Sequence, residues 1–164
     1  MPQHTIPPIF DKSSKVLILG SFPSVKSREQ QFYYGHPQNR FWRVLSDILK
    51  SDLPSSTTEK VALLLQNHIA LWDVISSCEI DGSDDSSIRD IVPNNLKLIT
   101  NTADIKRVFT NGEAEDKLYK KYCLSQTGIT ATRLPSTSPA NAGYKLEELI
   151  RAWTLLAESL KDTK

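Results

Sequence analysis

The chain has 164 residues, of which 39% are hydrophobic and 24% are charged, and these values suit one globular domain, 1–164, with an ordinary core. The formal net charge is +1, so overall charge gives no case for nucleic-acid binding, and any such case must be local. The longest apolar runs, around 15–20 and 61–75, fall short of the roughly 20 residues that span a bilayer, so we expect no membrane segment.

The beginning of the chain and its cysteines give further expectations. Residues 1–10 lack the basic stretch and apolar core of a signal peptide, so we expect an intracellular protein with an irregular segment at 1–12. Cys78 and Cys123 stand far apart, without a CxxC pair or nearby histidines, which favours buried thiols over a metal site. We therefore expect no metal, no cofactor and a monomeric protein.

Short aliphatic runs alternate with amphipathic stretches, which predicts βα units and a mostly parallel sheet covered on both faces. We expect four strands, at 15–21, 69–75, 106–110 and 129–134. Helical spacing predicts helices around 41–49, 61–66, 113–122 and 146–160. Pro93 is expected in the first turn of a further helix that carries Leu96 and Ile99, and loops are expected at 51–58 and 79–87.

In an open parallel sheet, ligands bind beyond the carboxyl ends of the strands. That rule points to 20–24, 72–74, 111–112 and 135–141, together with the stretch 33–39. The sequence Gly20–Ser24 (GSFPS) follows a buried strand and can hold backbone amides against a phosphate or a ring, although an ordinary tight turn is the alternative.

The stretch 33–42 (YYGHPQNRFW) concentrates aromatic rings, an imidazole, an amide and a guanidinium in ten residues, which stability alone does not require. Phe41 and Trp42 suit the core, whereas Tyr33, Tyr34, His36 and Asn39 suit stacking on and hydrogen bonding to a base. A helix cap is the alternative role for Asn39. In the stretch 134–141 (LPSTSPAN), the hydroxyls can grip phosphates, and a capped helix start, with Asn141 as the cap, is the alternative.

Together with ALWDVI at 70–75 and TNG at 110–112, these motifs resemble the hypoxanthine-DNA glycosylase branch of the uracil-DNA glycosylase superfamily. The resemblance covers most of the chain. It implies a three-layer α/β/α fold with a central four-stranded parallel sheet. It also implies a base-flipping enzyme of base-excision repair that removes deaminated bases from DNA, chiefly hypoxanthine, with xanthine as a further candidate.

The resemblance also implies roles for particular residues. Uracil enzymes of the superfamily position the attacking water with an Asp or Asn in the first motif, but the matching residue here is Phe22. The resemblance therefore implies that Phe22 is a wall on which the base stacks. It assigns the polar catalytic role to Asn39 instead. Leu134 stands where uracil enzymes have a histidine, and Ser138 where they have a leucine wedge. These positions therefore give no support to uracil activity or to a strong wedge.

Hydrolysis of an N-glycosidic bond needs a positioned water and a stabilised leaving base. We expect Asn39 to hold the water through its amide oxygen, and His36, or backbone amides near Ser21 and Phe22, to stabilise charge on the base. Asp73 can accept from N1 of hypoxanthine and disfavour adenine, with a cap as its alternative role, and Asn111 can contact O6 or N7, with a turn as its alternative.

Phosphate contacts are expected from the hydroxyls of the first and last motifs, Ser24, Ser136, Thr137 and Ser138. Cationic residues that can lie on the rim are Lys26, Arg28, Arg40 and Lys145, with a solvated charged face as the alternative for all of them. Two other functions stay open: a uracil-DNA glycosylase, or a non-catalytic nucleotide or nucleic-acid binding module on the same fold.

Overall fold

The centre of the protein is a four-stranded parallel sheet in the order β2-β1-β5-β6. The computed structural model describes residues 6–81 and 87–162. The strands are β1 (Val16–Gly20), β2 (Ile69–Asp73), β5 (Arg107–Asn111) and β6 (Ala131–Leu134). The four predicted strands and their parallel pairing are thus confirmed, within a few residues at each end.

The register brings the functional candidates to one edge of this sheet. Gly20 at the end of β1 pairs with Asp73 at the end of β2, and Asn111 at the end of β5 pairs with Leu134 at the end of β6. Because all four strands run in the same direction, their carboxyl ends meet at a common edge, where ligands bind in open α/β sheets.

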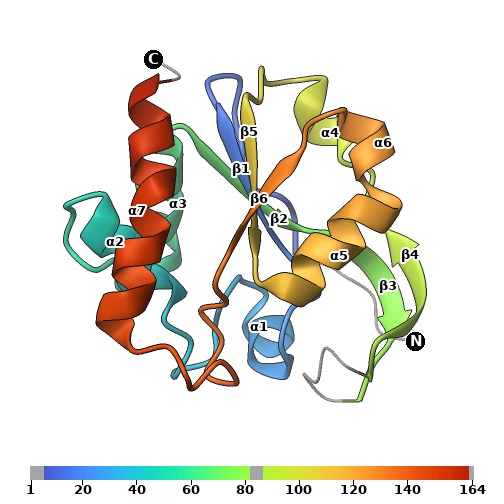
Figure 1. Cartoon of the computed structure of the whole chain (residues 1–164), viewed down its shortest axis with the longest axis horizontal. Helices are drawn as coiled ribbons and strands as arrows, with labels where there is room; N and C mark the ends of the chain where they lie inside the picture. Colours follow the sequence, from blue (N-terminus) through green and yellow to red (C-terminus); the bar gives the residue numbers. More distant parts are fainter. Residues whose placement is uncertain (1–5, 82–86, 163–164) are drawn as a thin grey trace.

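Helices cover both faces of the sheet, as Figure 1 shows. One face carries α2 (Phe41–Ile48), α3 (Thr57–Gln66) and α7 (Leu146–Asp162), and the other carries α4 (Lys97–Thr100), α5 (Glu113–Tyr122) and α6 (Leu124–Thr127). The short helix α1 (Val25–Gln30) lies beyond the end of β1. The predicted three-layer α/β/α arrangement is confirmed.

The layers are held together by a continuous apolar core. Val16, Leu17, Ile18 and Leu19 of β1 are completely buried, as expected for a strand with helices on both sides. Phe41 of α2 and Trp153 of α7 meet edge to face, with ring centroids 5.9 Å apart, which joins the two helices that flank the same face.

The segment predicted as one strand at 69–75 is two strands, and the helix expected to begin at Pro93 does not form there. The parallel strand β2 ends at Asp73, and the chain then forms an antiparallel hairpin of β3 (Ile75–Glu79) and β4 (Arg89–Pro93). Pro93 pairs with Ile75 in this hairpin, so α4 begins only at Lys97. The apolar run at 69–75 gave no indication that the chain leaves the parallel sheet at Val74 and then pairs in the hairpin.

Several other element boundaries also differ from expectation. α3 begins at Thr57, inside the loop expected at 51–58, because the Ser56 hydroxyl caps it by accepting from Glu59 N. β3 occupies the start of the loop expected at 79–87, of which residues 82–86 lie outside the described residues. In the irregular N-terminal segment, Ile9 forms a single antiparallel bridge with Leu71 beside β2.

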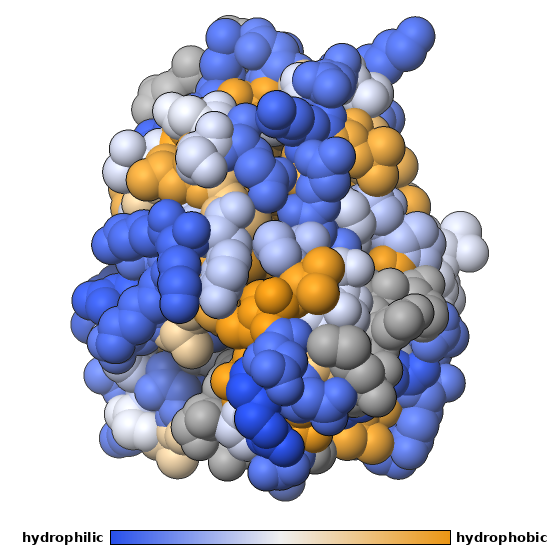
Figure 2. All heavy atoms as spheres, turned by 90° about the vertical axis from the view of Figure 1, so that its right-hand side faces the viewer, coloured by the Kyte–Doolittle hydropathy of each residue, from blue (hydrophilic) through white to orange (hydrophobic). Residues whose placement is uncertain are grey.

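Figure 2 shows the side of the molecule that carries the hairpin and α4 to α6, where hydrophobic side chains gather in the middle of a largely hydrophilic surface. The exposed apolar residues of these elements include Val92 and Leu98. Within residues 6–81 and 87–162, no helix has the length and apolar character needed to cross a bilayer, and no group of three or more His, Cys, Asp or Glu side chains is arranged to hold a metal ion.

Candidate functional site

A cavity of about 270 Å³ opens at the carboxyl edge of the sheet. Its walls come from the ends of β1, β2 and β5, from the stretch 33–39 and from the loop that follows β6. This cavity brings together all the residues that the sequence assigned to a site: Ser21, Phe22, Ser24, Tyr33, His36, Asn39, Asp73, Asn111, Ser136, Thr137 and Ser138.

A chain of hydrogen bonds crosses one wall of this cavity and fixes two of its amides. The backbone N–H of Thr137 donates to Oδ1 of Asn111 (3.0 Å), and Nδ2 of Asn111 donates to the Thr137 hydroxyl (3.0 Å). That hydroxyl donates in turn to Oδ1 of Asn39 (2.9 Å), which also accepts from the backbone N–H of Phe41 (2.9 Å). Because a backbone N–H can only donate, the identity of each amide oxygen follows from these contacts.

The amide of Asn39 therefore closes an Asx turn just before α2, whose capping position is Arg40, and is also a wall of the cavity. Its oxygen uses both lone pairs, one on Phe41 at the start of α2 and one on Thr137. This contradicts the expectation that Asn39 holds a water through its amide oxygen, because that oxygen has no acceptor capacity left. The Nδ2 group is the part of the amide that can still serve a ligand.

The same network changes the roles expected for two neighbours. Thr137 is completely buried, and its hydroxyl is committed to Asn39, so the expected contact of this hydroxyl with a DNA phosphate does not agree with its placement. Asn111 is 3% exposed and turns both ends of its amide toward Thr137. Its first task is to hold the loop after β6, and one hydrogen of Nδ2 is left over for a base.

Phe22 forms an apolar wall at the exit of β1. Its ring is 8% exposed, and the guanidinium of Arg28 lies over it, 5.4 Å from the centroid. Ser21, next to it, is also buried, with 6% of its surface exposed. Arg28 was expected as a rim charge for phosphate, but the structure places it against this ring.

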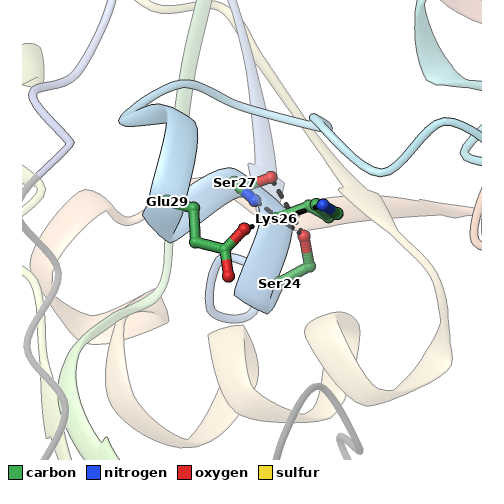
Figure 3. Close-up of polar contacts among 4 residues, drawn as sticks. All are labelled: Ser24, Lys26, Ser27 and Glu29. Atoms are coloured by element: carbon green, nitrogen blue, oxygen red, sulfur yellow. Dashed lines mark hydrogen bonds and ion pairs between the residues drawn. The ribbon is translucent and has the colours of Figure 1, made fainter.

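Ser24 begins α1 and is shown in Figure 3. Its hydroxyl oxygen accepts from the backbone N–H of Ser27 and lies 3.1 Å from Oγ of Ser27, whose hydroxyl accepts in turn from the backbone N–H of Gly35. These bonds tie the stretch 33–39 to α1. Lys26 pairs with Glu29 one turn along, at 3.7 Å and on the exposed side of the helix.

The two tyrosines at 33 and 34 belong to the frame of the cavity. Tyr33 is 2% exposed and donates its hydroxyl proton to the carbonyl oxygens of Pro7 (2.8 Å) and Ile6 (3.3 Å), and burial, together with the charge of Asp73, raises its pKa. Tyr34 stacks on Phe41, with centroids 4.0 Å apart. Tyr33 was expected to stack on a base, but its ring is part of the core.

His36 lines the cavity and is half-buried. Its Nδ1 accepts from the backbone N–H of Gln38 at 3.1 Å. A neutral imidazole that accepts at Nδ1 carries its proton on Nε2, so His36 can present an N–H donor.

Asp73 lines the cavity from the end of β2 and is 4% exposed. A Cβ on Gly20 would stand 2.4 Å from Oδ1 of Asp73 and 3.1 Å from the hydroxyl oxygen of Tyr34, so glycine is needed beside this carboxylate. Asn94 braces the turn behind it, because its Nδ2 donates to the carbonyl oxygens of Asp73 and Ile75.

The loop after β6 is organised by Arg40. Its guanidinium donates to the carbonyl oxygens of Ser138, Asn141 and Tyr144, and its backbone N–H donates to the carbonyl of Thr137. Arg40 was expected as a phosphate contact, but these bonds make it a clamp on the loop.

The hydroxyl oxygens of this loop take part in its own turns. Oγ of Ser136 accepts from the backbone N–H of Ser138, and Oγ of Ser138 accepts from that of Ala140. Both hydroxyl protons remain available to a ligand in the cavity. Asn141 does not cap α7, which begins at Leu146, but donates its Nδ2 to the carbonyl of Ser136.

Two lining residues, Ser27 and Glu115, were missed by the sequence analysis. Glu115 lies in the first turn of α5, is 7% exposed and faces the cavity between Asn111 and Ser136. No sequence pattern pointed to Glu115, because an acidic residue in the first turn of a helix is expected for helix stability alone.

Comparison with known proteins agrees with this architecture. A family model described as the uracil DNA glycosylase superfamily matches residues 7–157. Two proteins named hypoxanthine DNA glycosylase are each 34% identical: one from Methanosarcina barkeri over 86% of this chain and 89% of its own, and one from Methanosarcina acetivorans over 88% and 91%.

A solved structure is also similar throughout its length. A solution NMR structure from Methanosarcina acetivorans, described as that of a candidate uracil DNA glycosylase, superposes with a TM-score of 0.81 at 30% identity and covers 95% of this chain and 96% of its own. With the family model matching nearly the whole chain, and with the predicted sheet and motifs in place, the chain belongs to the uracil DNA glycosylase superfamily.

Proposed function

We propose that this protein is a monofunctional DNA glycosylase that hydrolyses the N-glycosidic bond of deaminated purines, chiefly hypoxanthine, in one domain and as a monomer. The observation that carries the proposal is the amide of Asn39, which is held rigidly at the cavity wall by Thr137 and Phe41. The names of the two relatives at 34% identity support hypoxanthine as the substrate.

The cavity suits a flipped base better than a phosphate group. Phe22 offers an apolar surface for stacking, and Asp73 offers a buried acceptor at the same side. Hypoxanthine carries a donor at N1, which a carboxylate accepts, whereas adenine has an acceptor there and would be repelled. Ser136 and Ser138 supply hydroxyl protons for the sugar and phosphates at the mouth, whereas the hydroxyl proton of Ser24 goes to Oγ of Ser27.

In this mechanism the chain orients a water and stabilises the departing base. Nδ2 of Asn39 donates to the oxygen of the attacking water, in place of the contact through the amide oxygen. His36 donates from Nε2 to the purine as electrons move onto it. An amide cannot remove a proton from water, so Asn39 acts by orientation.

A glycosylase assay tests this proposal. Duplexes that carry deoxyinosine, deoxyxanthosine or deoxyuridine are incubated with the protein, and abasic sites are cleaved with alkali. We expect breakage at deoxyinosine, and loss of breakage in Asn39→Ala. A matched control is Asn101→Ala, which removes an exposed amide at the end of α4 and should leave the rate unchanged. No breakage on any substrate would refute the proposed function.

Uracil is the second candidate substrate, because the similar NMR structure is described as a candidate uracil DNA glycosylase. Against it stand Phe22 in the place of a water-positioning side chain and Leu134 in the place of a histidine. Leu134 is 2% exposed and pairs with Asn111 in the sheet, so it offers nothing to a departing uracil. Breakage at deoxyuridine that exceeds breakage at deoxyinosine would favour this alternative.

A further inference from the structure

Glu115 is a second buried carboxylate of the cavity, and nothing in the mechanism so far uses it. It is 7% exposed and lines the cavity from α5, which follows β5, two strands away in the sheet from β2, the strand that ends at Asp73. A buried carboxylate that lines a ligand cavity is a candidate functional group.

The backbone makes room for this carboxylate. Gly112 has a φ of +117°, which favours glycine, and a Cβ there would stand 2.7 Å from Oε2 of Glu115 and 3.1 Å from Cβ of Ser136. Glu115 therefore lies against Gly112, beside the residue that precedes Thr137. The Thr137 hydroxyl bonds to Asn39, so the Glu115 carboxylate and the Asn39 amide both adjoin the loop after β6. We call the part of the cavity next to this loop its β6 half.

The chemistry of hydrolysis needs a proton acceptor in the β6 half. Oδ1 of Asn39 and Nδ1 of His36 already accept from Phe41, Thr137 and Gln38, so neither can take the proton of the attacking water. Among the described lining residues, the carboxylates are Asp73 and Glu115. Asp73 lies at the β1 and β2 side with Phe22, where the base is proposed to stack.

We propose that Glu115 is the catalytic proton acceptor for the attacking water. This inference rests on the proposed function. The water oxygen forms a bond with C1′ of the deoxyribose, the bond between C1′ and N9 breaks with its electron pair leaving on the purine, and the water proton passes to the Glu115 carboxylate. Asn39 holds the water through Nδ2 while Glu115 takes its proton, so each supplies what the other lacks.

A purely structural role for Glu115 is possible in the same place and has a different consequence. A glutamate at the third position of a helix can accept from the backbone N–H of the capping residue, here Gly112. A glutamine side chain has the same shape and retains an acceptor oxygen, but it cannot take up a proton. Glu115→Gln therefore separates a cap from a proton acceptor.

A matched control lies in the same turn. Glu113 is exposed and pairs with Lys117 at 3.2 Å across the helix surface, so Glu113→Gln removes one negative charge at the same helix end without touching the cavity. Asp73→Asn serves as the control for the other cavity carboxylate. The remaining ionisable groups around Glu115 are His36 across the cavity, Asp116 on α5 and Arg133 on β6, and none of these three is changed in any variant.

The experiment measures single-turnover cleavage of a deoxyinosine duplex from pH 5 to 9, together with thermal melting. For Glu115→Gln we expect a rate about 10² to 10⁴-fold lower, the usual range for a lost general base, with an unchanged melting temperature and a smaller fall in rate on the acid side than in the wild type. Glu113→Gln and Asp73→Asn should retain the acid-side fall. If wild type cleaves deoxyinosine and Glu115→Gln stays within threefold of it, the role of Glu115 is refuted alone; if wild type cleaves nothing, the proposed function is refuted with it.

Discussion

At the scale of single residues, the polar side chains of this cavity serve the fold and the ligand at the same time. Thr137 shows this most directly, because its hydroxyl accepts from Asn111 and donates to Asn39 while it is itself completely buried. A side chain that connects two others sets their orientation, and orientation is the main contribution that an amide can make to hydrolysis.

Replacing Thr137 by valine tests this connection. Valine has the same shape but leaves the amides of Asn39 and Asn111 without their shared partner, which should cost about 1 to 3 kcal/mol of unfolding free energy and lower the cleavage rate. Thr137→Ser keeps the hydroxyl and is the matched control. Urea unfolding and single-turnover cleavage measure the two effects, and a Val variant equal to the Ser variant in both would contradict this role.

Asp73 is expected to set the choice of base. Asp73→Asn places a donor as well as an acceptor at the base edge, so it should admit adenine and lower the ratio of deoxyinosine to deoxyadenosine cleavage by about tenfold, or roughly 1.4 kcal/mol of discrimination. The measurement is kcat/KM on both duplexes. An unchanged ratio with both rates reduced would mean that Asp73 serves only the stability of the turn that Asn94 braces.

The sequence placed the right residues at the cavity but not all the right roles. Strand ends of a parallel sheet must meet, so the location followed from periodicity alone. The roles of Arg40 and Thr137 depend on contacts between positions about a hundred residues apart, which no local pattern contains. Tyr33 was misjudged for a similar reason, since its hydroxyl partners lie in the N-terminal segment at Ile6 and Pro7.

At the scale of elements, the loop after β6 is held in place by the residues that precede α2. Arg40 reaches three of its carbonyl oxygens, and Asn39 next to it receives the Thr137 hydroxyl proton. A movement of α2 would therefore move the water-orienting amide and the Ser138 wall together. This loop has little regular structure of its own, so its shape depends on these bonds.

Arg40→Lys distinguishes a clamp from a phosphate contact. Lysine keeps the positive charge, but its ammonium group cannot reach three carbonyls as a planar guanidinium does. We expect faster cleavage of the loop 138–144 in limited proteolysis and a loss of about 1 to 3 kcal/mol in unfolding free energy. The control is Arg151→Lys on the exposed face of α7. If loop cleavage is unchanged while DNA affinity falls, Arg40 acts on phosphate instead.

The helices and strands were predictable where burial against the adjacent layer determines their residue pattern. A run such as Val16–Leu19 can be buried only between two layers of helices, and α5 and α7 have the spacing of helices that cover a sheet. The hairpin of β3 and β4 was not predictable in this way. Its strands pair with each other, away from the main sheet, and residue pattern alone does not tell a strand which partner to take.

At the scale of the whole molecule, the net charge of +1 means that recognition depends on the cavity and its rim. The candidate rim cations illustrate this. Arg28 and Arg40 are engaged with Phe22 and with loop carbonyls, and Lys26 is paired with Glu29. Weak long-range attraction to DNA agrees with an enzyme whose specific contacts are made to one flipped nucleotide.

The reactivity of the two cysteine thiols measures the unfolding of the whole molecule. Cys78 and Cys123 are completely buried, so a reagent in solvent does not reach either thiol. Burial also raises the pKa of the Cys123 thiol to about 11, which keeps the reactive thiolate form rare. In the unfolded chain the thiol returns to its ordinary pKa of 9.0 and reacts freely.

We expect an aromatic disulfide reagent at pH 8 to label the urea-unfolded chain at both thiols and the native protein only at the rate of unfolding. The raised pKa of Cys123 also makes the free energy of unfolding depend on pH. As pH rises from 9 to 11, the unfolded chain loses the Cys123 proton before the folded chain does, so stability falls across that range. Cys123→Ala should make this fall smaller. Urea midpoints at pH 8 and pH 10.5 measure it. Rapid labelling of native Cys123 would show instead that the face beneath α5 and α6 opens without unfolding of the sheet.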